Sequence, residues 1–220
     1  MKNNQNGRSM IEMLGVLAII GVLSVGGLAG YAKMMAQYRI NTTLQQIQIM
    51  TSKLSVQGSN GGSYEGLSAY TAYRLGALPS EIVESVDTSA KTATLSNIYA
   101  GAVKLEPASV LSGTCGEGCD YQAYTITYTN LPEEACLALG GSTWNSAQNS
   151  SMIGFGVGSA DNENNIKSEL SQDCEGKAEA GIAVACSGSK SKVTVPIDLD
   201  TVTDACTCDG SDCVMVLKFF

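Results

Sequence analysis

Residues 13–32 of this 220-residue chain read MLGVLAIIGVLSVGGLAGYA, and none of these 20 side chains carries a charge. Coiled as an α-helix, such a run is about 30 Å long, which matches the hydrocarbon thickness of a bilayer. The apolar core of a secretory signal peptide is shorter, roughly 7–15 residues. The run therefore predicts a helix that spans a membrane near the N-terminus.

Charged residues on both sides of the run bear on its orientation. Lys2 and Arg8 precede it, and cytoplasmic flanks tend to be positively charged, so we expect the N-terminus to lie in the cytoplasm. Lys33 and Arg39 on the other side weaken that bias. The remainder of the chain is then exported.

Glu12 lies at the edge of the apolar run, four positions after Arg8. A carboxylate near the membrane core is costly, which makes Glu12 a candidate functional residue. The alternative is that Glu12 lies among the lipid headgroups and pairs with Arg8 one helical turn away. Such a pair contributes only about 0.3 kcal/mol.

The stretch GRSMIEML at residues 7–14 resembles the processing site of type IV prepilins. In that family a prepilin peptidase cuts after a glycine and methylates the new N-terminus, and a glutamate lies five residues into the mature chain. The resemblance implies a leader at 1–7, cleavage between Gly7 and Arg8, N-methylation of Arg8, and a role in subunit assembly for Glu12. The family usually has an apolar residue at the first mature position, where this chain has Arg8.

The same resemblance gives Glu12 a partner. In a pilus the apolar helices bundle together, and a buried carboxylate there needs a cation beside it. We expect that cation to be the α-amino group of an adjacent subunit, which the cut after Gly7 creates.

The apolar run continues into an amphipathic segment. Four apolar residues recur there at offsets of 4, 3 and 7, which places them on one helix face: Ile40, Leu44, Ile47 and Leu54. The stretch GSNGG at 58–62 then ends the pattern. We predict a leader at 1–7, one helix over 8–57 with its membrane or filament-core part at 13–32, and a head at 58–220.

The head shows helical and strand patterns in turn. Residues 67–75 and 133–139 predict short helices, and four β-rich stretches predict strands: 121–129, 182–186, 192–197 and 214–219. The predicted fold class is α+β, with the long helix packed on an antiparallel sheet whose last strand is C-terminal. The glycine-rich stretch GFGVG at 154–158 is not a phosphate loop, because no Lys-Ser/Thr follows it.

All eight cysteines lie in the second half of the chain. An even number beside an export-type N-terminus predicts disulfides, and a zinc site is the alternative. Eight cysteines allow 105 pairings, among which three are local in sequence: Cys115 with Cys119, Cys174 with Cys186, and Cys208 with Cys213.

The head also resembles the type IVb pilins, the group of toxin-coregulated and thin-pilus subunits. The similar stretches are LGALPSE at 75–81, LPEEAC at 131–136 with Trp144 downstream, and a cysteine shortly before a terminal strand. The resemblance implies that Cys136 pairs with Cys206 or Cys208. That bond would close the long loop called the D-region in these proteins.

Composition excludes several classes of function. The net charge of −8 and the scattering of 13 basic residues argue against nucleic-acid binding. The chain has no histidine, so it lacks the commonest general base and the commonest zinc ligand. The acidic stretches at 161–165 and 198–212 lack the spacing of an EF-hand loop. We expect no enzyme activity, metal or cofactor.

The predicted function is that of a structural subunit of a bacterial type IV pilus. Its partners would be further copies of itself, the prepilin peptidase and the pilus assembly machinery. It would lie in the inner membrane before assembly and in the extracellular filament afterwards. A pseudopilin of a type II secretion system and a minor pilin are alternatives within the family. A secreted disulfide-rich protein is the alternative of another class.

Overall fold

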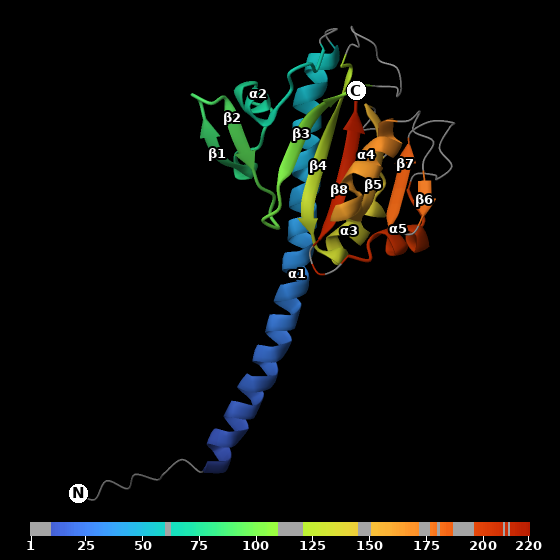
Figure 1. Cartoon of the computed structure of the whole chain (residues 1–220). Helices are drawn as coiled ribbons and strands as arrows, with labels where there is room; N and C mark the ends of the chain where they lie inside the picture. Colours follow the sequence, from blue (N-terminus) through green and yellow to red (C-terminus); the bar gives the residue numbers. More distant parts are fainter. Residues whose placement is uncertain are drawn as a thin grey trace, which may run out of the picture. The chain divides into compact units, whose positions relative to one another are not determined.

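The computed structural model describes residues 10–59, 63–109, 121–144, 151–171, 177–179, 181–186, 196–208, 210 and 212–220. Helix α1 (Met10–Ser59) opens the described chain (Figure 1). The chain divides into a first unit, Met1–Arg39, and a second unit, Ile40–Phe220, and α1 contributes to both.

The second unit is built on a six-stranded antiparallel sheet. The spatial order of its strands is β3 (Val103–Ala108), β4 (Ala123–Leu131), β8 (Cys213–Phe219), β5 (Met152–Ser159), β7 (Ile182–Cys186) and β6 (Lys177–Glu179). The last strand in sequence, β8, therefore lies inside the sheet, between β4 and β5. A separate two-stranded sheet pairs β1 (Val83–Asp87) with β2 (Thr92–Leu95).

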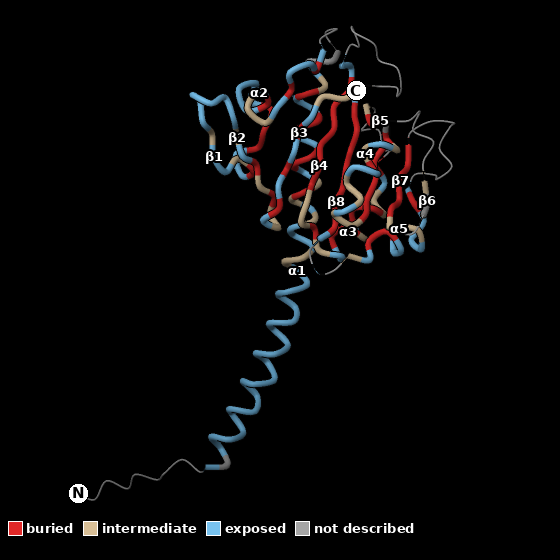
Figure 2. The backbone as a smooth tube through the Cα atoms, viewed as in Figure 1, coloured by how far each residue is buried: buried red, intermediate tan, exposed pale blue. Residues whose placement is uncertain are grey.

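One face of the large sheet packs against the second half of α1, which Figure 1 shows behind the strands. Ile47, Met50 and Leu54 of α1 are buried in one cluster with sheet side chains such as Tyr124 and Phe219. Ile40 and Leu44 are partly buried against the same cluster. The predicted apolar helix face is confirmed, and so is the predicted fold class. Figure 2 shows the buried strands of this unit.

The opposite face of the sheet is covered by helix α4 (Glu163–Ser171). Its Ile166 and Leu170 pack against Val184 of β7 and Val214 and Val216 of β8. The residues at 154–158 form most of strand β5 rather than a loop. A Cβ atom on Gly156 would lie 2.5 Å from Cγ2 of Ile166, so glycine is what lets α4 approach this closely.

Short helices precede or connect the strands, and local sequence signals mark where they begin or end. Helix α2 (Ala69–Arg74) begins with a capping box between Ser68 and Thr71, and Gly76 follows its end with φ +66°. Helix α3 (Glu133–Gly140) follows Pro132, and α5 (Leu199–Ala205) follows Asp198. The described residues also contain 3₁₀ turns at Ser80–Ile82 and Ala160–Asn162.

The predicted helices at 67–75 and 133–139 agree with α2 and α3. The strands predicted at 121–129, 182–186 and 214–219 agree with β4, β7 and β8 within two residues. The strand predicted at 192–197 lies mostly outside the described residues. Its last two positions are described, and they lead into α5 without strand structure.

Candidate functional site

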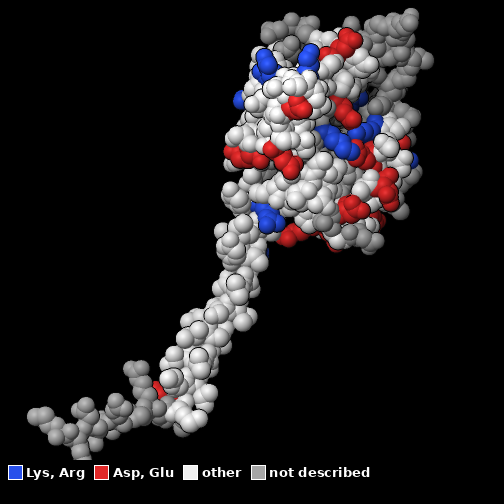
Figure 3. All heavy atoms as spheres, turned by 60° about the vertical axis from the view of Figure 1, so that its left-hand side comes forward, with Lys and Arg blue, Asp and Glu red and all other residues white. Residues whose placement is uncertain are grey.

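The first unit presents an apolar helix surface on all sides. Within residues 13–34 of this unit, twelve large apolar side chains are more than half exposed: Met13, Leu14, Val16, Leu17, Ile19, Ile20, Val22, Leu23, Val25, Leu28, Tyr31 and Met34. Figure 3 shows this segment almost free of charged groups. A helix that is apolar all round belongs in lipid or inside a protein assembly. Among the described residues, α1 is the one helix long and apolar enough to cross a membrane.

Glu12 lies in the first turn of α1 and is exposed. The partial positive charge of a helix N-terminus favours a carboxylate at that place. Gly7 and Arg8 lie outside the described residues. The cut between them, the methylation of Arg8 and the assembly role of Glu12 therefore stay predictions.

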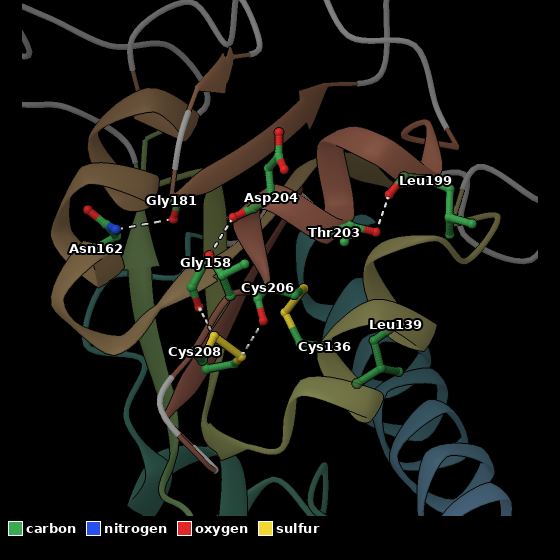
Figure 4. Close-up of a disulfide and its surroundings, with 12 residues drawn as sticks. Cys136, Leu139, Gly158, Asn162, Gly181, Leu199, Thr203, Asp204, Cys206 and Cys208 are labelled. Atoms are coloured by element: carbon green, nitrogen blue, oxygen red, sulfur yellow. Dashed lines mark hydrogen bonds between the residues drawn. A yellow bond between two sulfur atoms is a disulfide. The ribbon is translucent and has the colours of Figure 1, made fainter.

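A buried disulfide ties two helices of the second unit together. It joins Cys136 of α3 to Cys206 at the end of α5, residues 70 positions apart in sequence (Figure 4). The similarity to type IVb pilins implied either Cys206 or Cys208 as the partner of Cys136, and in the structure the partner is Cys206. Both cysteines are fully buried.

A second disulfide lies beside the first one. It joins Cys208 to Cys213, the first residue of β8. Because these sulfur atoms are bonded to each other, they offer no thiolate to a zinc ion. Cys186 is also disulfide-bonded. The three cysteines that remain, Cys115, Cys119 and Cys174, lie outside the described residues.

Polar side chains fix the segments that carry the first disulfide. The Trp144 indole donates a 2.7 Å hydrogen bond to the carbonyl oxygen of Leu139, and its ring lies 5.9 Å from that of Phe155. Asp198 caps α5 by accepting hydrogen bonds from the backbone and hydroxyl of Thr201, which lower the pKa of Asp198. Asp198 thus serves as a helix cap, a local role that its spacing before the helix would have allowed us to predict.

A charged cluster joins α4 to strand β3, and the sequence analysis missed it. Glu163 accepts hydrogen bonds from Lys104 at 2.8 Å and Lys167 at 2.7 Å, and Lys167 also contacts Glu106 at 2.6 Å. Burial alone would raise the pKa of Glu163, but the two lysines outweigh it and lower this pKa. Only the pair at 163 and 167, one helical turn apart, carried a sequence signal.

The fold and the apolar helix define the structural class of this protein. The class combines a long helix, apolar in its first half, with an antiparallel sheet, and a disulfide-bonded segment flanks the C-terminal strand of that sheet. A family model described as PilS N terminal matches residues 37–198. The chain therefore belongs to the PilS family. The resemblance to type IV pilins predicted from the sequence is confirmed. The match begins after the apolar run, so it does not include the stretch at 7–14 that resembles a prepilin processing site.

The solved structures include a similar chain, a type IV b pilin from Salmonella typhi. The two sequences are 18% identical, the TM-score is 0.47, and the match covers 80% of this chain and 97% of the other. No curated protein matches the chain. The family makes this chain a type IV pilin subunit, a structural protein and not an enzyme.

Proposed function

We propose that the chain is made as a prepilin, cut after Gly7 by a prepilin peptidase and methylated on Arg8. The mature subunit then polymerises through the first half of α1 into an extracellular type IV pilus. Before assembly it is held in the inner membrane by residues 13–32. The observation that carries the proposal is the apolar surface of the first unit, exposed on every side.

An apolar surface of this size has to be shielded from water. Burying one large aliphatic side chain is worth about 1.5–3 kcal/mol, so the twelve exposed side chains represent on the order of 20 kcal/mol. Lipid can provide that shielding, and so can the equivalent helices of neighbouring subunits. Because both surroundings are apolar, the subunit can pass from one to the other without exposing the helix to water.

Glu12 restricts how the apolar helix can pack once it leaves the lipid. Its carboxylate would be unfavourable in the middle of an apolar bundle unless a cation lies beside it. The cut after Gly7 creates a new α-amino group, and the amine of an adjacent subunit can then pair with Glu12. Pairing at one place along the helix sets the axial register between subunits.

Processing is tested first, by mass spectrometry of the mature protein purified from sheared surface filaments. The proposal predicts a chain that begins at Arg8 and is about 14 Da heavier from one methyl group. A mature chain that begins at Lys33 would instead show cleavage by an ordinary signal peptidase. That result would rule out the prepilin proposal.

Assembly is tested with Glu12→Gln, which keeps the side-chain size and removes the charge. We expect membrane-held subunits and few or no filaments in electron micrographs. The matched control is Glu65→Gln, which removes an exposed carboxylate from the second unit and should leave filaments unchanged. Normal filaments from Glu12→Gln subunits would contradict the assigned role of Glu12.

A further inference from the structure

The two disulfides at the end of α5 lie close enough to exchange partners. The sulfur atoms of Cys136, Cys208 and Cys213 all lie within 4.8 Å of one another. Cys206 and Cys208 are separated by one residue, and a 2.9 Å hydrogen bond from the Cys208 N–H to the Cys206 carbonyl oxygen holds that turn closed. Figure 4 shows the two sulfur pairs next to each other.

Access to this cluster is unequal. Cys136, Cys206 and Cys213 have no exposed surface, whereas Cys208 is half-buried. Thiol–disulfide exchange needs direct contact between the attacking thiolate and a sulfur atom of the bond. A thiolate from outside the protein therefore meets Cys208 first.

We propose that Cys208 is the entry site for an external thiolate, and that the buried Cys136–Cys206 bond is opened through the Cys208–Cys213 bond. The partner is of the class of thiol–disulfide oxidoreductases, which present one exposed reactive cysteine. The same route run backwards would form the buried bond. This inference concerns the second unit alone and does not depend on filament assembly.

The chemistry proceeds by two exchanges. In the first, the external thiolate attacks the sulfur of Cys208: a mixed disulfide forms, the Cys208–Cys213 bond breaks, and Cys213 leaves as a thiolate. In the second, Cys213 attacks the sulfur of Cys136: a Cys136–Cys213 bond forms, the Cys136–Cys206 bond breaks, and Cys206 leaves as a thiolate. One thiolate enters, one is released, and the number of disulfides is conserved.

The geometry also selects which sulfur of the buried bond is attacked. Cys136, and not Cys206, belongs to the group of sulfur atoms within 4.8 Å of one another. Exchange therefore frees Cys206. Because Cys206 ends α5 and Cys136 lies in α3, this step releases the covalent link between the two helices.

The test is partial reduction of the folded, full-length protein with reduced glutathione. Free thiols are blocked at intervals with N-ethylmaleimide, and the linked peptides are identified by mass spectrometry. We expect an early species with glutathione on Cys208, a Cys136–Cys213 bond and the blocking group on Cys206. Glutathione on Cys208 with the blocking group on Cys213 and an intact Cys136–Cys206 bond is the product of the first exchange. If that species accumulates and no Cys136–Cys213 bond forms at any time, the proposal is overturned.

Two variants give an independent measurement. In Cys208→Ala/Cys213→Ala the entry site is gone, and we expect the Cys136–Cys206 bond to be reduced at least about tenfold more slowly than in the wild type. An unchanged rate would overturn the proposal. In the matched Cys136→Ala/Cys206→Ala variant, glutathione should join Cys208 at the wild-type rate. Near-UV circular dichroism checks that each variant is folded, and the wild-type experiment needs no variant.

Discussion

The ammonium group of Lys218 donates a 2.8 Å hydrogen bond to the carbonyl oxygen of Leu170, in the last turn of α4. Lys218 belongs to β8 and is fully buried on the α4 side of the sheet. Carbonyl groups at a helix C-terminus carry partial negative charge and lack partners within the helix, so a lysine is favourable there. Even so, burial lowers the pKa of Lys218 to about 8.

This lowered pKa predicts that stability rises with pH. Below pH 8 Lys218 is charged in both states, whereas above pH 8 the native state loses the proton and the unfolded state keeps it up to the ordinary pKa of lysine. From pH 7 to pH 9 we expect this residue to add on the order of 1 kcal/mol to the free energy of unfolding. Urea titrations of wild type and Lys218→Met measure it, because the variant should lack this gain. Lys53→Met, at an exposed position, is the control and should keep it. The same pH dependence in Lys218→Met and wild type would contradict the prediction.

The two disulfides should contribute unequally to stability. The Cys136–Cys206 bond closes a loop of 70 residues and the Cys208–Cys213 bond one of 5. In the chain-entropy model their removal costs about 4 and about 2 kcal/mol. Denaturant unfolding of the two double-alanine variants measures the difference. Equal losses would show that the length of the closed loop does not decide the effect.

Glu163 should stabilise the contact between α4 and β3 through its two lysines. We expect Glu163→Gln to lower the free energy of unfolding by about 1 kcal/mol at pH 7, and by less at high salt, because the pairs are partly exposed. The loss should vanish in acid: the pKa of Glu163 is lowered, so its contribution exists above the ordinary carboxyl pKa and disappears as pH falls through the native value. Asp161→Asn, which removes an exposed carboxylate nearby, should have little effect in the same titration.

Gly156 should be intolerant of a side chain. A Cβ atom there would lie 2.5 Å from Ile166 and 2.9 Å from Val184, so Gly156→Ala should cost about 1–3 kcal/mol. Ile166→Ala alone should also destabilise, because it leaves a cavity. Combined, the two changes should cost less than the sum of their separate effects, since the smaller side chain makes room for the new methyl group. Additive losses in a thermal unfolding series would argue against this contact.

The sequence predicted the elements whose signals are local. The apolar run, the face of Ile47 and Leu54, the alternation in β4 and the β-rich composition of β8 each lie within one segment. Strand β5 was missed because its glycines weaken strand propensity. The glycines of β5 allow α4 to approach the strand closely, and this requirement comes from a helix later in the chain.

In the candidate site, too, residues with a local sequence signal could be predicted and contacts between distant residues could not. Glu12 was visible because a carboxylate beside an apolar run is unusual. Cys136 was matched to two possible partners through the type IVb resemblance alone, since spacing does not distinguish pairings over 70 residues. Lys218 lies in a stretch that was predicted as a strand from its composition, and nothing in the sequence indicated that its ammonium group is buried. Lys104 meets Glu163 over 59 positions, which a single sequence does not reveal.

The place of β8 in the sheet has a consequence for biogenesis. Its neighbours β4 and β5 bond to β8 and not to each other, although both precede it in sequence. When the chain emerges N-terminus first from a ribosome or through a membrane, one edge of β4 and one edge of β5 stay unpaired until β8 has emerged. Such edges invite pairing with other chains. The interval before β8 arrives is therefore when a holding chaperone would be needed, and truncations that remove β8 should aggregate rather than fold.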